Sequence, residues 1–310
     1  MFRNLVMQQT GTCLVLTFLA AAVAAKEEPA LEPIVVDLTT KDQVLLKATF
    51  YGQPVGSRAV PVVLLHDCKG SRNTFDGLAS FLQERGFAVV VPDLRGHGRS
   101  TRQRVDGPAG IRTLEASSLR KPDFICMVKF DMEAVRRFLV SKNDQEVVNL
   151  NALCLVGAEM SATIAINWTA KDWMMPPLAI KKQGQDVKAV VLLSPQMSFK
   201  GVPVKQALAA LIGREIRDKI SYLILVGDGD SRGLRDARRI EKTLSKWHTR
   251  ADHGTSVDKQ TLFFHAVPTS LKGTKLLTAD GNNIQNGIAR FLKLRVVDQD
   301  FPWIKRRTGG

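Results

Sequence analysis

The sequence predicts an α/β fold with a mostly parallel central sheet and helices on both of its faces. Short, almost wholly apolar runs such as Val60–Leu65 and Val187–Leu193 are typical of strands that are buried on both faces. Amphipathic segments with helical spacing alternate with these runs, as the connections of a parallel sheet require. The length of 310 residues, 45% of them hydrophobic, is sufficient for one large core.

The elements follow in order along the chain. The expected strands are Ile34–Thr39 and Gln43–Phe50 as a leading hairpin, then Val60–Leu65, Phe87–Val91, Leu153–Val156, Val187–Leu193, Tyr222–Val226 and Thr261–Ala266. The expected helices are Thr74–Arg85, Phe124–Val140, Met160–Ala170, Val204–Ile212, Leu234–Trp247 and Asn282–Leu294. Thr101–Asp123 is polar and turn-rich and follows a strand end, where ligand sites of open α/β sheets gather. No other insertion is long enough for a large lid domain.

The N-terminus has the pattern of a signal peptide over residues 1–25. Arg3 precedes an apolar run, Cys13–Ala25, which ends in small residues. This run is short for a membrane span, so we expect an exported protein, periplasmic or secreted, with no transmembrane helix in its mature form; an uncleaved anchor is the alternative. Residues 26–33 then form a tether, 34–295 the folded domain, and 296–310 a basic C-terminal tail that we expect to fray.

The net charge is +14, and because removal of residues 1–25 takes away only Arg3, the mature charge stays near +13. Outside the cytoplasm, this surplus favours an anionic envelope polymer over nucleic acid as a partner. A solvated basic surface without a dedicated partner is the simpler interpretation. The spacing of the remaining cysteines, Cys68, Cys126 and Cys154, predicts neither a disulfide framework nor a metal site, and no cofactor is expected.

Four stretches carry a resemblance to a known family. They are Val62–Gly70, which contains His66-Asp67-Cys68; Gly86–Ser100, which contains Asp93-Leu94-Arg95-Gly96-His97-Gly98; Leu153–Ser161; and Leu223–Asp230 with the loop Val267–Leu277. Together they resemble the α/β-hydrolase superfamily, in particular dienelactone hydrolases and esterases. In this family the second stretch is a structural turn, so we expect Asp93, Arg95, Gly96 and Gly98 to shape the backbone and His97 not to act as a base.

The third stretch resembles the strained strand-to-helix turn, G-x-S-x-G, that carries the nucleophile of this family. Gly157 and Ser161 occupy the small flanking positions, so Glu159 stands where the serine is expected. The alternative register centres the turn on Ser161, but it needs a charged residue at the end of the strand. The resemblance also implies an oxyanion hole formed by the backbone N–H groups of Cys68 and Met160.

The acid and the histidine of the family follow the nucleophile in chain order. Asp230 matches the acid position, with Asp228 as the second choice, and Lys272 stands at the histidine position. His265 lies one element too early, inside a strand, and remains open as a displaced base, whereas His253 lies earlier still. The resemblance therefore implies a degenerate triad of Glu159, Asp230 and Lys272.

Three functions are compatible with this substituted site. The first is a non-hydrolytic protein, a pseudoenzyme that binds a small molecule or partner through the former pocket. Its charges would form an ion cluster in which Lys272 bridges Glu159 and Asp230, and the change Lys272→Met would cost about 3–5 kcal/mol if the cluster is buried. The second is an active hydrolase of an ester or related bond, with Glu159 as base or nucleophile. The third is a surface module that adheres to anionic polymers through Arg232 and through one helix face formed by Arg235, Arg238, Arg239 and Lys242.

Overall fold

The fold is that of a computed structural model, which describes residues 31–306 apart from 108–109, 177, 179–181, 214–215, 217 and 250–255. The expected signal peptide lies outside the described residues, as do the first five residues of the tether. The strands are β1 (Ile34–Thr39), β2 (Val44–Tyr51), β3 (Val60–Leu65), β4 (Phe87–Pro92), β5 (Arg102–Arg104), β6 (Ile111–Thr113), β7 (Leu153–Ala158), β8 (Val187–Leu193), β9 (Ser198–Phe199), β10 (Val202–Pro203), β11 (Ser221–Gly227), β12 (Leu262–Val267) and β13 (Ala279–Asn282).

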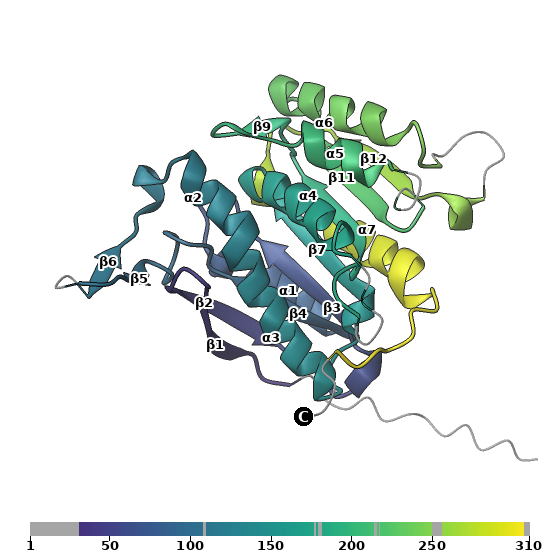
Figure 1. The fold of residues 1–310 in the computed structure, drawn as a ribbon. Helices are drawn as coiled ribbons and strands as arrows, with labels where there is room; N and C mark the ends of the chain where they lie inside the picture. Colours follow the sequence, from purple (N-terminus) through teal and green to yellow (C-terminus); the bar gives the residue numbers. More distant parts are fainter. Residues whose placement is uncertain are drawn as a thin grey trace, which may run out of the picture.

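The main sheet in the described part of the chain has ten strands in the order β12-β11-β8-β7-β3-β4-β2-β5-β6, and β1 pairs with β2 (Figure 1). The strands from β12 to β4 run parallel, whereas β1, β2, β5 and β6 pair antiparallel. The carboxyl ends of the parallel strands therefore meet at one edge of the sheet, where the candidate site residues lie.

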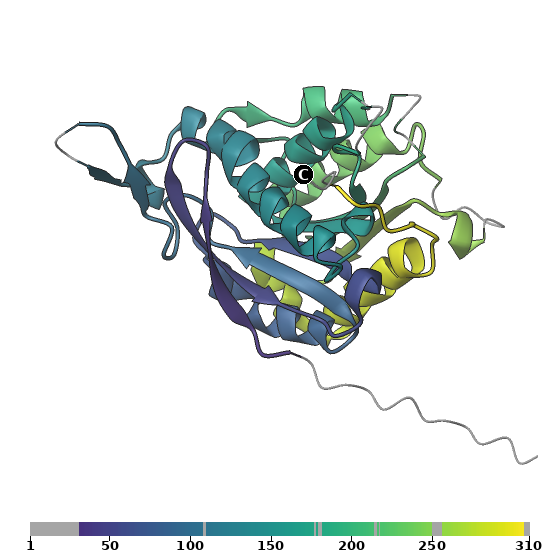
Figure 2. The same ribbon diagram turned by 60° about the horizontal axis from the view of Figure 1, so that its bottom comes forward.

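The helices cover both faces of this sheet, as the alternating pattern predicts. They are α1 (Asp76–Gln83), α2 (Lys121–Cys126), α3 (Met132–Asp144), α4 (Met160–Trp173), α5 (Lys205–Leu211), α6 (Ser231–Leu244) and α7 (Asn283–Leu292). The hydrophobic core between α1, α7 and the sheet is separate from the core between the helices α3 to α6 and the sheet. Both views show the sheet between these two helix layers (Figures 1 and 2).

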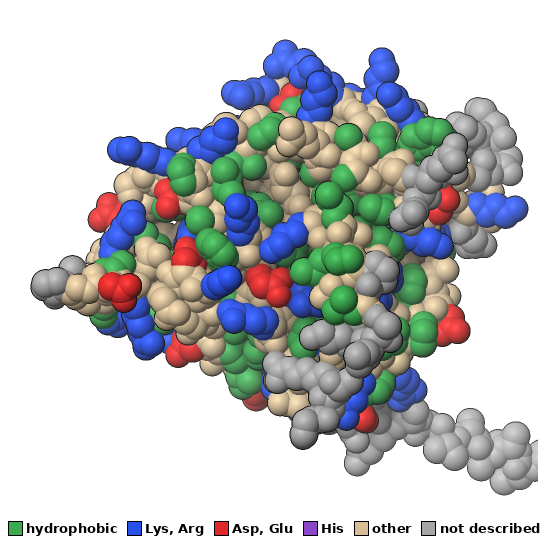
Figure 3. Space-filling model, viewed as in Figure 1, with side chains coloured by type: hydrophobic (Ala, Val, Ile, Leu, Met, Phe, Trp, Pro, Cys, Tyr) green, Lys and Arg blue, Asp and Glu red, His purple; other side chains and the backbone are tan. Residues whose placement is uncertain are grey.

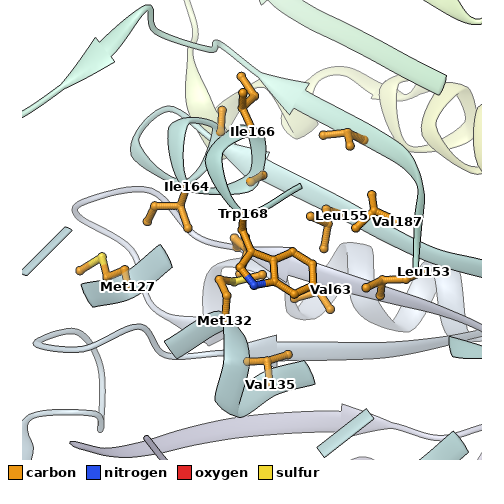
Figure 4. Packing of buried hydrophobic residues seen from close by; sticks show 14 of the residues in the cluster. Val63, Met127, Met132, Val135, Leu153, Leu155, Ile164, Ile166, Trp168 and Val187 are labelled. Atoms are coloured by element: carbon orange, nitrogen blue, oxygen red, sulfur yellow. The ribbon is translucent and has the colours of Figure 1, made fainter. Parts of the chain in front are cut away.

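Alternate residues of each central strand enter opposite cores. In β3, Val63 belongs to the core beneath α3 and α4, whereas Val62 belongs to the core beneath α1 and α7. Trp168 of α4 fills the first core beside Met132 and Leu155 (Figure 4). Burial on both faces explains why these strands are continuously apolar in the sequence.

Two segments differ from the sequence prediction. Within Thr101–Asp123, β5 and β6 form a short hairpin that pairs with β2 and projects from the body of the domain (Figures 1 and 2). This polar segment therefore extends the far edge of the sheet, and its residues do not line the pocket described below. The predicted helix Phe124–Val140 is present, but a π-helical turn at Met127–Asp131 joins α2 to α3.

The expectation that the C-terminal tail frays is wrong for residues 301–306. The side-chain amides of Asn149 and Asn151 donate hydrogen bonds to the carbonyl oxygens of Phe301 (2.6 Å) and Pro302 (2.9 Å). Arg306 is buried, and its Nη1 lies 2.7 Å from a carboxylate oxygen of Asp186. The sequence suggested an exposed basic tail because these contacts join residues more than a hundred positions apart.

No helix in the described residues has an apolar stretch long enough to cross a bilayer. The three described cysteines, Cys68, Cys126 and Cys154, are free thiols.

Candidate active site

The predicted turn at Glu159 is confirmed in its geometry. Glu159 links β7 to α4 with φ 48° and ψ −103°, a backbone conformation that L-residues rarely adopt. The turn is tight: a Cβ atom on Gly157 would lie 2.6 Å from the carbonyl oxygen of Ser161. Only glycine fits at position 157, which explains the small residue that defined the register.

The alternative register, centred on Ser161, is wrong. Ser161 is fully buried in the first turn of α4, and its hydroxyl donates a short hydrogen bond to the carbonyl oxygen of His66. This hydroxyl ties the start of α4 to the end of β3. It is therefore not placed to attack a substrate.

The three residues at the triad positions line one shallow pocket at the carboxyl edge of the sheet, with a volume of about 90 Å³. The lining residues are Glu159, Ser194, Gln196, Asp230, Arg232, Gly233 and Lys272. Glu159 follows β7, Asp230 follows β11, and Lys272 lies in the loop after β12. The chain order and strand ends of the resemblance therefore bring these side chains together as expected.

The expected ion cluster does not form among these residues. Asp230 uses its side chain to cap α6, because its Oδ1 accepts a hydrogen bond from the N–H of Gly233 at 3.1 Å. Lys272 is exposed, and no carboxylate of the described chain lies within 4.0 Å of its ammonium. The Glu159 carboxylate likewise has no ion pair or hydrogen bond with the described residues. The pocket thus holds opposite charges near one another that are not paired.

Burial raises the pKa of Glu159 above its ordinary value of 4.5. The positive charge of Lys272 opposes this rise, whereas the negative charges of Asp67 and Asp230 add to it. A carboxylate with a raised pKa is a stronger base than an ordinary carboxylate, because a higher pKa means a greater affinity for a proton.

Asp67, the residue in place of the family's usual glycine, faces the loop after β12. Its Oδ2 accepts a hydrogen bond from the hydroxyl of Thr274 at 2.9 Å. A Cβ atom on Gly273 would lie 3.1 Å from this Oδ2 and 3.2 Å from Cγ of Glu159, so both acidic side chains approach the same glycine. The close approach explains why Asp67 affects the pKa of Glu159.

The N–H groups of Cys68 and Met160, the expected oxyanion donors, donate no hydrogen bond within the described residues. Met160 is the first residue of α4, where helix N–H groups lack intrahelical acceptors. In the loop after β3, the carbonyl oxygen of Cys68 is bound instead, because it lies 3.0 Å from Nε2 of His97. The loop is thus held from its carbonyl side and leaves the Cys68 N–H available.

The described histidines do not supply the missing base. His66 is buried, which lowers its pKa to about 4, and its Nε2 accepts a hydrogen bond from the N–H of Leu94. Both ring nitrogens of His97 contact carbonyl oxygens, in agreement with its expected structural role. His265 is exposed on the edge strand β12 and does not line the pocket, and His253 lies outside the described residues.

The structural turn that contains Asp93 and Arg95 is built as the resemblance implies. Asp93 accepts hydrogen bonds from the N–H groups of Arg72 and Arg99, and a Cβ atom on Gly98 (φ 52°) would lie 2.3 Å from Asp93. The guanidinium of Arg95 binds Asp42 and Asp131, while Gly96 also has a positive φ of 76°. These contacts saturate the turn and leave no role for it in catalysis.

The sequence did not predict that Ser194, Gln196 and Gly233 line the pocket, and it placed Arg232 only on a basic helix face. Ser194 follows β8 with φ 49°, and its hydroxyl oxygen accepts a hydrogen bond from the N–H of Gly273 at 3.0 Å. The available signal was position, because Ser194 follows a buried strand that neighbours β7 in the sheet.

A family model for the alpha/beta hydrolase fold matches residues 60–211, which run from β3 to α5 and include the turn at Glu159. No curated protein matches the chain. Among solved structures, an esterase from Pyrococcus furiosus is 15% identical with a TM-score of 0.58, covering 86% of this chain and 91% of its own. A highly thermostable carboxyl esterase from Bacillus coagulans is 11% identical with a TM-score of 0.57, covering 86% and 99%.

An esterase from Exiguobacterium antarcticum is 15% identical with a TM-score of 0.51, covering 84% of this chain and 100% of its own. At these identities, the likeness concerns the fold. The order of the parallel strands, the turn between β7 and α4, and the family model agree with one another. The chain therefore has the α/β-hydrolase fold, and its residues 60–211 match the family model of that fold.

Proposed function

We propose that the chain is a hydrolase of an ester or related acyl bond, in which Glu159 acts as the general base. The non-hydrolytic hypothesis followed from the missing serine and histidine and included an ion cluster that neutralises the pocket. Those ion pairs do not form among the described residues. The three esterases of the same fold add support for ester chemistry.

One observation carries the proposal. The Glu159 carboxyl has a raised pKa and no partner in the described residues, and it lines a pocket from a strained backbone turn. Such a conformation costs of the order of 1–3 kcal/mol, which a glycine at this position would avoid. Retaining strain and an unpaired carboxylate is costly for a scaffold but useful for a residue that must reach a substrate.

The proposed reaction begins when the Glu159 carboxylate takes a proton from a water molecule. At the same time, the oxygen of this water attacks the acyl carbon of the ester. The carbonyl oxygen then becomes an oxyanion, which accepts hydrogen bonds from the N–H groups of Cys68 and Met160. The tetrahedral intermediate collapses, the bond to the leaving oxygen breaks, and Glu159 returns its proton to that oxygen. The products are an acid and an alcohol, and Glu159 is again ionised.

The length of the side chain favours a base over a nucleophile. The carboxylate oxygens of glutamate are two carbons farther from Cβ than a serine Oγ would be, so they extend past the usual point of attack. This extension disfavours direct attack by Glu159 on the acyl carbon and leaves proton transfer from a water molecule as its role.

The test is hydrolysis of a neutral, short-chain activated ester by the wild type, by Glu159→Gln and by Ser161→Ala. We expect wild-type turnover above buffer, a loss of about 10²–10⁴-fold in Glu159→Gln, and retention in Ser161→Ala. A single turnover in H₂¹⁸O should place the label in the product acid and not in Glu159. Absence of wild-type turnover, or turnover that survives in Glu159→Gln, would contradict the proposal.

A further inference from the structure

One face of α6 and of the turn that follows it carries a continuous stripe of exposed cations. Its members are Arg232, Arg235, Arg239, Lys242 and Lys246, all exposed, at helical spacings of three and four residues. Figure 3 shows the Lys and Arg side chains gathered along the edge of the molecule where α6 lies in Figure 1. We refer to these five residues as the α6 stripe.

The stripe is not neutralised by its own surroundings. Within the described chain, no carboxylate lies within 4.0 Å of any of its five cations. Arg238, which the helical spacing predicts on the same face, instead lies over the ring of Phe264 and pairs with Glu241. Like charges three and four residues apart destabilise a helix, so the stripe opposes folding unless an anion covers it.

The α6 stripe begins at the pocket itself. Arg232 lines the pocket beside Glu159 and Asp230. The exposed cations Lys69 and Lys272 also lie near enough to Glu159 to affect its pKa. A substrate that reaches Glu159 therefore meets positive charge at the mouth of the pocket and along the adjoining helix.

The length of the α6 stripe indicates the size of the ligand. Arg232 and Lys242 are ten positions apart in α6, which corresponds to about 15 Å of helix with roughly one cation per 5.4 Å turn, and Lys246 extends the stripe into the following turn. A small anion would contact only one or two of these cations, whereas an extended chain with regularly spaced negative charges can contact all five. The exposed side chain of Trp247 follows Lys246 directly and offers a ring on which a sugar or a nucleobase can stack, so the choice of polymer rests on the ester chemistry and on the binding test below.

We propose that the substrate is an acidic polysaccharide that carries acyl esters, with its carboxylates along the α6 stripe and one ester at Glu159. This inference rests on the proposed function, because it names the substrate class of the same site. The polymer must carry acyl esters, because these are the bonds that the proposed enzyme hydrolyses. Polysaccharides carry them as O-acetyl groups, whereas the phosphodiester backbone of nucleic acids has none.

The experiment compares one ester on two polymers. Acetate release is measured from acetylated polygalacturonate and from acetylated xylan, which is neutral. The enzymes are the wild type, the stripe variant Arg235→Glu/Arg239→Glu, and Arg104→Glu/Arg112→Glu, which makes the same charge change at exposed positions of the β5–β6 hairpin. Neither pair includes a residue of the pocket.

We expect kcat/KM of the wild type to be at least about tenfold higher on the acidic polymer at low ionic strength, and the preference to fall with added salt. The stripe variant should lose this preference and keep its rate on the neutral activated ester, whereas the hairpin variant should keep both. Equal rates of the wild type on both polymers, or equal losses in the two variants, would overturn the inference.

A binding titration separates this inference from the proposed function. Unesterified polygalacturonate should bind the wild type and the hairpin variant, and should bind the stripe variant at least about tenfold more weakly, whether or not any ester is hydrolysed. Absence of turnover with stripe-dependent binding would reject the hydrolase and retain the polymer site. Failure of polygalacturonate to bind, or stripe-dependent binding of single-stranded DNA with equal affinity, would reject the polysaccharide.

Discussion

The two ends of the central sheet each hold a carboxylate, and these two carboxylates differ in how many cations surround them. At the amino end, Asp186 precedes β8 and is fully buried, and cationic nitrogens of Arg306, Arg136 and Lys182 lie 2.7, 3.4 and 3.7 Å from its oxygens. At the carboxyl end, Glu159 is half-buried and has no cation within 4.0 Å among the described residues. The first carboxylate is compensated, and the second is not.

This difference distinguishes Asp186, whose charge serves the fold, from Glu159, whose charge is free to react. The cations around Asp186 attract it without hydrogen-bond geometry, and one of them, Arg306, fastens the C-terminal segment to the domain. Glu159 gains no such compensation, keeps a strained backbone and faces a pocket. The amino end therefore serves stability, and the carboxyl end keeps a reactive group at the cost of stability.

The largest effect on stability is expected at the amino end. Asp186→Ala removes the common partner of one buried and two partly buried cations, which should lower the free energy of unfolding by about 3–5 kcal/mol. The measurement is equilibrium denaturation in urea. The exposed pair Lys293–Asp298 provides the control, because Asp298→Ala should cost less than about 1 kcal/mol. Equal losses in the two variants would remove the distinction between compensated and exposed carboxylates.

A smaller effect of opposite sign is expected at the carboxyl end. Glu159→Gly relieves the positive φ and removes a half-buried charge, so it should raise the free energy of unfolding by about 1–2 kcal/mol while it abolishes turnover. Glu146 has φ 59° but is exposed and lies between α3 and β7, before the amino end of β7, so Glu146→Gly is the control and should retain turnover. Destabilisation by Glu159→Gly would show that the carboxylate supports the fold.

The smallest effect on stability is expected for Lys272→Met. The sequence interpretation of a buried cluster implied a loss of about 3–5 kcal/mol. Because Lys272 is exposed and unpaired in the described chain, we now expect a change below about 1 kcal/mol. A loss above about 3 kcal/mol in urea denaturation would restore the ion cluster.

The sequence predicted what local packing decides. The two-sided burial of strands such as β3 and β8 makes them continuously apolar, and the tight approach of Gly157 to Ser161 identified the turn at Glu159. Side-chain partners could not be predicted in the same way. Asp230 is bound by the first turn of α6 instead of by Lys272, and Arg306 reaches Asp186 only because the distant C-terminal segment folds back.

The acid limb of the pH dependence of kcat/KM, measured on a neutral ester, tests the role of Glu159 most directly. Glu159 must be ionised to accept a proton, and its pKa is raised, so activity should disappear as the pH falls through a value above 4.5. Because Lys272 lowers this pKa, Lys272→Met should move the limb to higher pH with little loss at the plateau. A limb that stays in place in Lys272→Met, or that persists unchanged in Glu159→Gln, would contradict the assignment of Glu159 as the base.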